Sequence, residues 1–422
     1  MKDSERPQAV TTAEKKCAKC GACTSVCPVY RASGNEIYSA RGKRHLADVF
    51  GDEQPGPVFE DIYSKCLLCG ACSTVCPRKL DITEDVMEAR SEFSPYYGEH
   101  GYQKSLARKV LNRPELLGAA RVLGKKAADV LFGRLPAGSG LKLRLAMFTE
   151  SDALAAEPTF QLPRNIENNE NAMVYFPGCA ASYLYPKIVE SVSDLLADYG
   201  YKLQIPSGLS CCGLALMAAG DRSGAQRLAR NNIQLFEQSD GPIMVSCGSC
   251  FAHLTRYPHL FEEDETWKTR AKLVCERLVE ISRFIEMLQQ EEPLSFAKRQ
   301  SSLKVFYHDP CHMRHDLKIT DEPRTLLRAL PGVELLELPD GPQCCGQGGL
   351  FHLGAPELSS VIRDDLAGKI LAMNPDVITT TCSGCLMQLK TAMAAAESKV
   401  PVIHLAALIN KRSQEGENEW LS

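Results

Sequence analysis

This chain of 422 residues lacks the features that mark membrane and secreted proteins. No stretch approaches the roughly 18 consecutive apolar residues that a transmembrane helix requires. The first sixteen residues contain no apolar core of the kind found in a secretory signal. We therefore expect a cytoplasmic protein, whose association with the inner face of the membrane would be peripheral or through a partner.

The chain also lacks the signals of several binding and redox classes. Its net charge of -4 argues against a nucleic-acid partner, because nucleic-acid-binding domains are usually strongly basic. No G-x-G-x-x-G motif stands between a strand and a helix, which argues against a flavin or nicotinamide fold within this chain. No C-x-x-C-H motif for haem attachment occurs either. Any flavin should therefore belong to a partner.

Cysteine, in contrast, is abundant, at 19 residues. In a long chain without secretory features, so many thiols indicate a cofactor protein in a reducing compartment rather than a disulfide scaffold. All but one fall into motifs. The exception, Cys275, lies in a segment expected to be helical, where we interpret it as a small buried hydrophobic residue.

Two C-x2-C-x2-C-x3-C-P runs near the start are the most specific local signal. Such runs bind [4Fe-4S] cubanes, and in two-cluster ferredoxins the fourth cysteine of each run ligates the other cluster. The 38 residues between the runs contain a predicted helix start at 39–46, which favours a helical ferredoxin domain over residues 1–98. The predicted ligands are Cys17, Cys20, Cys23 and Cys76 for one cluster and Cys66, Cys69, Cys72 and Cys27 for the other.

A second cysteine pattern occurs twice in the remainder of the chain. Each copy has a strand-like run that ends at a single cysteine, then Cys-Cys-Gly, then C-x-x-C, with corresponding cysteines 132 to 135 residues apart. So long a period indicates a duplicated domain, which we place at residues 172–290 and 302–412. The candidate ligands are Cys179, Cys211, Cys212, Cys247 and Cys250 in the first copy and Cys311, Cys344, Cys345, Cys382 and Cys385 in the second.

Five thiols per copy are one more than a tetrahedral zinc site or a cubane cluster uses. An iron-sulfur cluster of unusual geometry could use all five, whereas structural zinc with a spare thiol is the alternative. We expect one or two further [4Fe-4S] clusters here, for which a noncubane geometry is an option. Short apolar strands alternate with helical stretches in each copy, which indicates a small α/β unit with its cysteines on loops at strand ends, near the surface or between the copies. The expected class is thus α+β, with a helical ferredoxin-like domain followed by the duplicated unit.

Residues 99–171 separate the two parts and are read as a basic helical segment followed by a linker. Between positions 101 and 145 there are ten Lys or Arg residues and two acids. This charge could bind an acidic partner or an anionic membrane surface. A solvated helix face is an equally good interpretation.

The two copies differ around their first cysteine. Ala180, Ala181 and Ser182 follow Cys179, whereas the surroundings of Cys311 are rich in ionisable side chains. This asymmetry predicts that the second site handles protons or anions and that the first carries electrons; hydrogen bonds from the histidines to backbone near a cluster are the alternative. The ionisable residues are His308, Asp309, His312, Arg314 and His315. The candidate catalytic residues are Cys344, Cys345 and His312.

The repeated pattern resembles the cysteine-rich CCG domain of heterodisulfide reductase, glycerol-3-phosphate dehydrogenase and glycolate or lactate oxidase iron-sulfur subunits. Two ferredoxin motifs followed by two CCG domains resemble, over nearly the whole chain, the iron-sulfur subunit of flavin-dependent glycolate or lactate oxidases. Shared stretches include YHDPCHMRH at 307–315 and GCLMQL at 384–389. This resemblance implies an FAD-containing 2-hydroxy acid dehydrogenase subunit as partner, and electron transfer to quinone or another carrier.

Other functions stay open at this stage. Both C-x-x-C motifs are complete, whereas the closing motif is often incomplete in glycolate oxidase subunits. Complete motifs look more like the heterodisulfide reductase catalytic subunit, in which a CCG cluster cleaves a disulfide. The iron-sulfur subunit of anaerobic glycerol-3-phosphate dehydrogenase resembles the CCG half better than the amino-terminal half. A cluster-based redox sensor is disfavoured because no DNA-binding signature is present.

Overall fold

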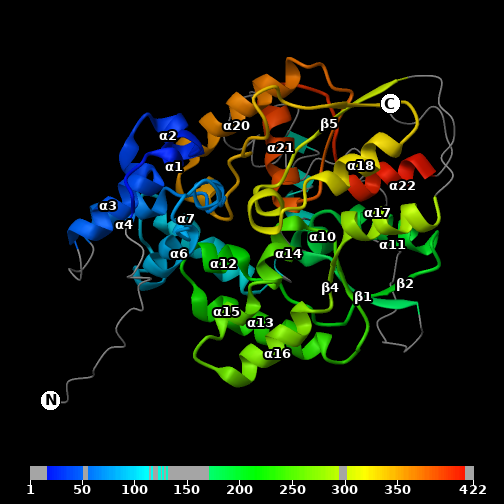
Figure 1. The fold of residues 1–422 in the computed structure, drawn as a ribbon, viewed down its shortest axis with the longest axis horizontal. Coiled ribbons are helices and arrows are strands. Elements are labelled where there is room, and N and C mark those ends of the chain that lie inside the picture. The colour runs from blue at the N-terminus through cyan, green and yellow to red at the C-terminus, as the bar shows by residue number, and fades with distance from the viewer. Residues whose placement is uncertain are drawn as a thin grey trace.

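The computed structural model describes residues 17–50, 56–113, 171–293 and 302–413, with a few positions between 116 and 131. A helical N-terminal body is followed by two sheet-containing halves (Figure 1). We call these halves the first repeat (171–293) and the second repeat (302–413).

The N-terminal body contains only helices among its described residues, as the spacing between the two cysteine runs predicts. Helices α2 and α4 both begin at a proline, which suits the first turn because it has no amide hydrogen to leave unpaired. Helix α6 is capped by Asp81, whose carboxylate accepts from the amide of Glu84 at 3.1 Å. The elements are α1 (Ala22–Ser25), α2 (Pro28–Ser33), η1 (Glu36–Tyr38), α3 (Ala40–Phe50), α4 (Pro57–Ser64), α5 (Ala71–Thr74), α6 (Ile82–Glu92) and α7 (Gly101–Leu111).

The first repeat is a parallel four-stranded sheet with strand order β2-β1-β3-β4. Its central strands are wholly apolar and buried, as expected for a parallel sheet covered on both faces. The elements are β1 (Ala172–Phe176), α10 (Gly178–Tyr183), α11 (Pro186–Ala197), β2 (Lys202–Gln204), α12 (Leu214–Ala218), α13 (Arg222–Phe236), β3 (Ile243–Val245), α14 (Gly248–Leu254), α15 (Tyr257–Leu260), α16 (Glu265–Cys275), β4 (Leu278–Glu280) and α17 (Ile281–Glu291).

The second repeat has the same order, β6-β5-β7-β8, and is also fully parallel. The predicted duplication is therefore confirmed at the level of topology. The elements are β5 (Leu303–Tyr307), η3 (Met313–Leu317), α18 (Asp321–Ala329), β6 (Val333–Leu336), α19 (Phe351–Gly354), α20 (Pro356–Leu371), β7 (Val377–Thr380), α21 (Ser383–Ala395), β8 (Val402–His404) and α22 (Leu405–Ser413).

The repeats pack through equivalent helices. Helix α11 contacts α22, and α17 contacts α18, so the first long helix of each repeat lies against the last helix of the other (Figure 1). The Arg283 guanidinium forms a 2.7 Å ion pair with Glu322 across this contact. The loops at the carboxyl ends of the two sheets meet. There the Gly248 amide of the first repeat donates to the Thr381 carbonyl of the second at 2.9 Å. In open parallel sheets this end is where ligands usually bind.

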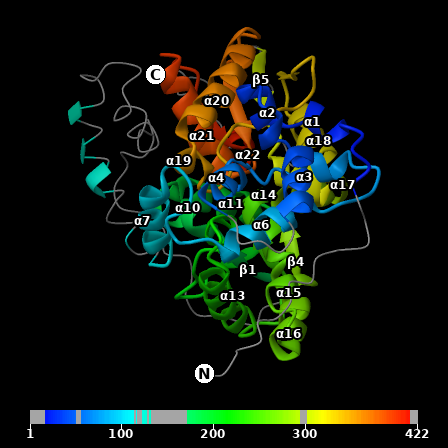
Figure 2. The same ribbon diagram turned by 90° about the vertical axis from the view of Figure 1, so that its left-hand side faces the viewer.

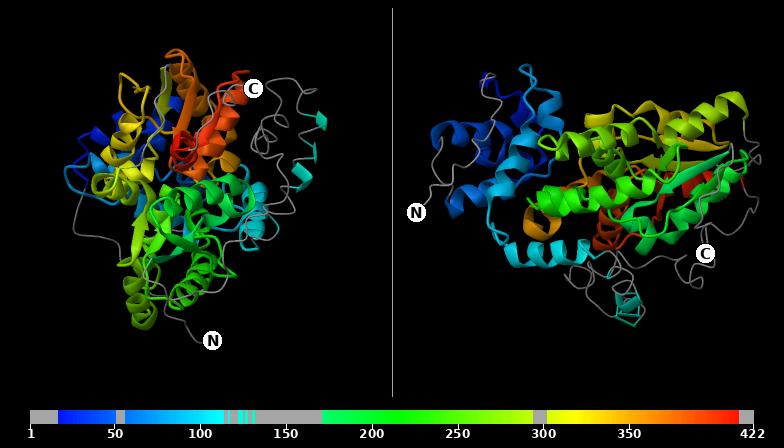
Figure 3. Two further views of the ribbon diagram at one scale, coloured as in Figure 1. Left: turned by 90° about the vertical axis from the view of Figure 1, so that its right-hand side faces the viewer. Right: turned by 90° about the horizontal axis from the view of Figure 1, so that it is seen from below.

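The N-terminal body lies at one end of the paired repeats and touches both (Figures 2 and 3). Its contact with the first repeat depends on Arg90, a buried guanidinium that donates to the carbonyls of Tyr63, Ser64, Cys66 and, across the interface, Ala218 at 2.6 Å. Its contact with the second repeat runs through α2 and α20.

Most of the predicted basic segment falls outside the described residues. In its described part, α7, Lys104 is buried over the ring of Tyr97 at 3.5 Å, and Arg108 lies 3.7 Å from Asp221 of the first repeat. These two cations therefore serve packing rather than an open basic surface. No helix among the described residues is long and apolar enough to span a membrane.

Candidate metal centres

The eight cysteines of the two ferredoxin-type runs form two neighbouring sets. Cys17, Cys20, Cys23 and Cys76 line one cavity, next to Arg41 and Arg44, and Cys72 of the second run also reaches it. Cys27 lies instead beside the second run, where its pKa is raised mainly by burial and also by the charge of Cys66. The position of Cys76 among the cysteines of the first run, and of Cys27 beside the second, is compatible with crossed ligation, and the ligand assignment itself stays a prediction.

A buried lysine accompanies the second of these sets. The side chain of Lys43 is 2% exposed, and its ammonium donates to the carbonyls of Tyr38 and, at 3.1 Å, Lys65. Burial lowers the pKa of Lys43, while the charges of Cys66 and Cys27 act in the opposite direction. A cation held here would stabilise negative charge on the cysteines around it. This role could not be recognised from the sequence, because Lys43 lies in a basic stretch that resembles a solvated helix.

In each repeat the five cysteines gather at the carboxyl end of the sheet. Cys179 and Cys247 follow β1 and β3, the two central strands between which the strand order reverses. The sulfurs lie close together, with 3.4 Å between Cys179 and Cys211 and 3.5 Å between Cys345 and Cys385. Such distances suit sulfurs that share a metal centre.

The double-cysteine motifs behave alike in the two repeats. Hydrogen bonds from the neighbouring thiols Cys179 and Cys212 lower the pKa of Cys211, and those from Cys311 and Cys345 lower the pKa of Cys344. The pKa values of these donor thiols are raised in turn. Burial and the neighbouring thiols thus oppose the ionisation of most sulfurs in each set, and binding all five as thiolates would require a metal centre to compensate them.

Glycine is needed after each pair of cysteines. Gly213 and Gly346 have φ angles of +95° and +86°, a region that favours glycine. The Gly346 amide lies 3.5 Å from the Cys344 sulfur. A β-carbon at Gly346 would also lie 3.0 Å from the carbonyl oxygen of Ser359 on α20. The glycine therefore allows both the turn and the close packing of the following helix.

The two five-cysteine sets meet across the repeat interface. Cys247 and Cys382 are hydrogen-bond partners, which lowers the pKa of Cys382 and raises that of Cys247. Ser249 of the first repeat lies with its hydroxyl 3.0 Å from the Cys382 sulfur. Of the two predicted locations, the surface and the space between the repeats, the structure places these cysteines between the repeats.

The second repeat also adjoins the ferredoxin-type cysteines. Burial raises the pKa of Cys69, and the charge of Cys344 raises it further. The charge of Cys69 likewise contributes to raising the pKa of Cys311. The Thr74 hydroxyl lies 3.1 Å from His315 Nδ1, which joins the loop of the second run to the second repeat. The four cysteine sets therefore form one continuous series.

A cavity of about 770 Å³ opens where the N-terminal body meets the second repeat. Three cysteines from two sets reach it, namely Cys69, Cys311 and Cys344. Basic side chains outnumber acids in its lining, and of the acids Asp309 is paired with Arg324 at 3.0 Å and Asp365 with Lys369 at 2.6 Å. The basic residues are Arg31, Arg314, Lys318 and Lys369, and the third acid is Asp340. His315 also lines the cavity, but burial lowers its pKa to about 4. The cavity can accept an anionic or electron-rich group beside the cysteines.

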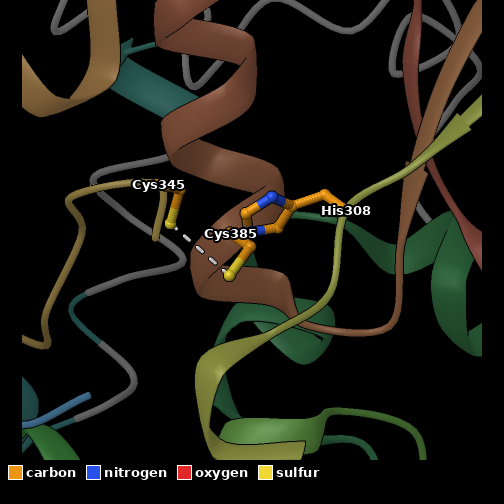
Figure 4. Close-up of side chains that lie close together, drawn as sticks. All are labelled: His308, Cys345 and Cys385. Carbon is orange, nitrogen blue, oxygen red and sulfur yellow. Dashed lines mark hydrogen bonds between the residues drawn. The ribbon is translucent and has the colours of Figure 1, made fainter. Parts of the chain in front are cut away.

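One histidine lies within the second set. His308, at the end of β5, is 2% exposed, and its donor atom and the sulfurs of Cys345 and Cys385 all lie within 4.8 Å of one another (Figure 4). Its Nε2 atom has no hydrogen-bond partner among the described residues. Burial lowers the pKa of His308.

The three candidate catalytic residues do not share one cavity. Cys344 borders the 770 Å³ cavity, Cys345 is buried, and His312 lines a separate pocket against the first repeat. His312 Nδ1 lies 3.1 Å from the Ser249 hydroxyl. Cys275 is partly buried and donates to the carbonyl of Leu254 at 3.2 Å, as expected for a structural thiol.

Comparison with known proteins agrees with this arrangement. A family model described as a 4Fe-4S dicluster domain matches residues 14–80, and one described as a cysteine-rich domain matches 173–255 and 305–390. The chain is 28% identical to the probable glycolate oxidase iron-sulfur subunit of Bacillus subtilis, over 93% of this chain and 92% of that protein. It is 30% identical to lactate utilization protein A of a Geobacillus strain, over 56% of this chain and 98% of that protein.

The chain belongs to this family of glycolate oxidase and lactate utilization iron-sulfur proteins. The resemblance inferred from the cysteine motifs is thereby confirmed, as is a ferredoxin-like domain followed by two CCG domains. The matched domains also indicate iron-sulfur clusters as cofactors. A hypothetical protein from Helicobacter pylori has a similar fold, with a TM-score of 0.54 over 91% of this chain and 69% of that one at 9% identity.

The cysteine sets of this family member fit the clusters. Buried sulfurs within 3.4 to 3.5 Å of one another, closed in by glycine turns, are suitable donors to iron. Five donors per repeat exceed the needs of a zinc ion, so the donor set favours a multinuclear centre over structural zinc.

Proposed function

We propose that this chain is the electron-transfer subunit of a flavin-dependent 2-hydroxy acid dehydrogenase that acts on glycolate or lactate. Support comes from the two named relatives and from the absence of a flavin-binding motif in the sequence. The partner would be an FAD-containing subunit that oxidises the hydroxy acid. When bound, the iron-sulfur clusters would accept and pass on single electrons.

The observation that carries this proposal is the continuous series of cysteine sets. Two cubanes would be held by the crossed sets given above, and the five cysteines of each repeat would hold a further cluster. The series would run from the Cys17 set to the Cys66 set, then across the cavity that Cys69 and Cys344 both line to the second repeat, and through Cys382 and Cys247 to the first. Such closeness between neighbouring sets suits a relay.

The residues around the series would tune and enclose it. Lys43 would stabilise added negative charge at the Cys66 set, because its ammonium is held in place by two backbone carbonyls. Burial of Cys247, Cys345, Cys382 and Cys385 would keep water from the centres of the repeats. The 770 Å³ cavity would be the point of exchange with the partner or with an acceptor, either quinone or another carrier.

The test compares the isolated chain with the complex. The anaerobically purified chain should hold about sixteen iron atoms, from two cubanes and two further four-iron centres. It should show no turnover of glycolate or lactate with an artificial acceptor, because it has no flavin to accept a hydride. Adding the FAD-containing partner should restore turnover. Two zinc ions per chain with about eight iron atoms would contradict the assignment of the repeats.

A second candidate function is reduction of a disulfide at the second repeat, as in heterodisulfide reductase. The cavity favours it, because Cys311 and Cys344 are both accessible there. In this case the isolated chain, reduced by an artificial donor, should reduce a low-molecular-weight disulfide. Replacement of Cys344 or Cys345 by serine should abolish that activity. Such turnover by the isolated chain would replace the first proposal.

The crossed ligation has its own test. Cys76→Ser should disturb the cluster of Cys17, Cys20 and Cys23, and Cys27→Ser should disturb that of Cys66, Cys69 and Cys72. Electron paramagnetic resonance (EPR) spectra of the reduced variants distinguish the two clusters. Loss of the cluster made by the variant's own run alone would contradict the assignment.

A further inference from the structure

The two repeats place different residues at the end of their first strand. Tyr175 pairs with Met244, three residues before Cys247, and Tyr307 pairs with Thr379, three residues before Cys382. These registers make the two tyrosines equivalent. The next position is therefore Phe176 in the first repeat and His308 in the second, and both side chains are buried.

His308 is directed at the cysteine set rather than at solvent or backbone. Figure 4 shows its ring beside the sulfurs of Cys345 and Cys385, which come from the Cys-Cys-Gly loop and from the start of α21. The two sulfurs are 3.5 Å apart, and the histidine donor atom is within 4.8 Å of both. Three donors at these separations can bind one metal ion, whose bonds to sulfur and nitrogen are about 2.0 to 2.3 Å long.

The histidine has no other evident role among the described residues. A buried polar group normally has a hydrogen-bond partner, because leaving it unpaired costs roughly 1–3 kcal/mol. His308 Nε2 has no such partner in the described part of the chain, although only 2% of the residue is exposed. Phenylalanine at the equivalent position in the first repeat shows that the fold itself does not require a polar group there.

We propose that His308 is a metal ligand, which binds iron of the second-repeat cluster beside Cys345 and Cys385. The second repeat then has six protein donors and the first has five. The inference rests on the proposed function only in taking the metal to be iron. Substitution of imidazole for thiolate removes negative charge from a cluster and raises its reduction potential, as histidine does in Rieske centres. A thiolate donor in place of His308 should therefore lower the midpoint potential of the second-repeat cluster.

The first repeat also contains a buried histidine, but on a different element. His253 lies on α14, three residues after Cys250, and is 4% exposed. Its Nε2 atom likewise has no hydrogen-bond partner among the described residues, but in that part of the chain His308, and not His253, shares a group of three metal donors. The equivalent residue of the second repeat is Gln388, three residues after Cys385, whose amide donates to the Ser359 hydroxyl at 3.1 Å. His253→Gln is therefore a control that removes a buried histidine near a cluster by using the side chain of the other repeat.

The test is nitrogen-sensitive pulsed EPR on the anaerobic full-length holoprotein, poised so that the second-repeat cluster is paramagnetic. We expect one strongly coupled nitrogen, several-fold larger in coupling than a hydrogen-bonded backbone amide, that shifts when only histidine carries ¹⁵N. His308→Phe should lose it, and His253→Gln should keep it. His308→Cys retains a donor at the same position, so it should keep its iron, lose the nitrogen coupling and show a lower midpoint potential.

Several results would overturn the proposal. One is the detection of weak nitrogen couplings alone in the unmodified protein. Another is a strong nitrogen coupling that remains in His308→Cys, and a third is loss of the strong coupling in His253→Gln. Metal analysis separates this inference from the proposed function. If the second repeat held zinc, nitrogen in the zinc coordination sphere that disappears in His308→Cys would support His308 as a ligand while counting against the iron-sulfur assignment.

Discussion

The first repeat encloses its double-cysteine motif, whereas the second leaves one side of it open. Cys211 is 3% exposed, while its counterpart Cys344 is only partly buried and borders the 770 Å³ cavity. Pro177 and Gly178 precede Cys179, and Asp309 and Pro310 precede Cys311. Duplication has thus preserved the positions of the sulfurs and of the strands, while the residues between them have diverged. Any difference in chemistry between the two centres must come from these neighbours.

The largest expected effect concerns a buried ion pair that only the second repeat contains. Arg324 pairs with Asp309, with 11% and 2% of the two side chains exposed. At the equivalent positions of the first repeat, counted from its first cysteine, Val192 replaces the arginine and Pro177 replaces the aspartate, and neither is charged. Arg324→Val leaves a buried carboxylate without its partner, which typically costs about 3–5 kcal/mol. The thermal midpoint of the anaerobic holoprotein should fall by about 6–10 °C.

The double variant tests whether the apolar arrangement of the first repeat can replace this pair. Asp309→Ala combined with Arg324→Val should recover most of the lost midpoint, because removing both charges is often close to neutral. A double variant as unstable as Arg324→Val would mean that the pair does more than compensate its own charges. A loss below about 2 °C in the single variant would show that the pair contributes little to stability.

The next effect is a pH dependence of opposite sign in the two repeats. Glu280 and His404 end the equivalent strands β4 and β8, and each accepts from an amide two residues later, Ser282 at 2.9 Å and Ala406 at 3.2 Å. Burial raises the pKa of Glu280 to about 7 and lowers that of His404 to about 4. Glu280 thus favours its protonated form in the folded state, and His404 favours its neutral form.

The two residues therefore oppose each other in the same pH range. The contribution of Glu280 is fully present below pH 4.5 and is lost as the pH rises towards 7. That of His404 is fully present above pH 6.5 and is lost as the pH falls towards 4. Each shift corresponds to roughly 3 kcal/mol at most. Between pH 4.5 and 6.5, the free energy of unfolding of Glu280→Gln should rise with pH more steeply than that of the unmodified protein. For His404→Gln the change with pH, taken relative to the unmodified protein, should be a decrease. Identical pH profiles of the thermal midpoint in all three proteins would contradict the assignment.

A smaller effect should distinguish the open side of the second repeat from the rest of the surface. Arg314 and Lys318 line the cavity, and within the described residues their side chains donate to the carbonyls of Pro342 and His315 rather than to carboxylates. The double variant Arg314→Gln/Lys318→Gln should slow oxidation of the reduced protein by ferricyanide about tenfold at low ionic strength. The difference should shrink at high ionic strength.

The exposed first-repeat residue Lys272 provides the control for this cavity. Lys272→Gln removes a positive charge far from the cavity lining and should leave the ferricyanide rate unchanged. An uncharged acceptor should react with all variants at similar rates, because steering acts on charge. Equal slowing by Lys272→Gln and by the cavity variant would show that only net charge matters.

Much of this arrangement could be predicted because the spacing of the cysteines is a local pattern that can be recognised in the sequence without knowledge of the fold. The two runs, the two repeats and the central strands at 174–176, 243–246, 305–308 and 377–381 were all readable from alternation and period, and the strands begin and end within two residues of these ranges. The order of the cysteine sets was not readable, since the approach of Cys69 to Cys344 joins segments about 275 residues apart. Nor could the sequence tell which polar residues turn inward. His308 and His312 were both expected near Cys311, and the structure differs between them: His308 lies beside the sulfurs of Cys345 and Cys385, whereas His312 reaches Cys382 through Ser249.

The smallest expected effect tests whether the repeats tune each other across their interface. Ser249 of the first repeat lies 3.0 Å from the Cys382 sulfur, and its counterpart in the second repeat is Gly384, which has no side chain to offer Cys247. A ligating thiolate has no proton to donate, so the serine hydroxyl must donate to it while accepting from His312 Nδ1. Hydrogen bonds to cluster sulfurs stabilise the reduced state and raise the reduction potential.

Ser249→Ala should therefore lower the midpoint potential of the second-repeat cluster and leave the first-repeat cluster nearly unchanged. A hydrogen bond worth about 1 kcal/mol corresponds to about 40 mV for a one-electron couple. Ser249→Thr retains the hydroxyl and should keep the original potential. An EPR-monitored redox titration of the three proteins measures these shifts. A shift confined to the first-repeat cluster would place the influence of Ser249 within its own repeat, and the two centres would then be tuned independently despite their contact.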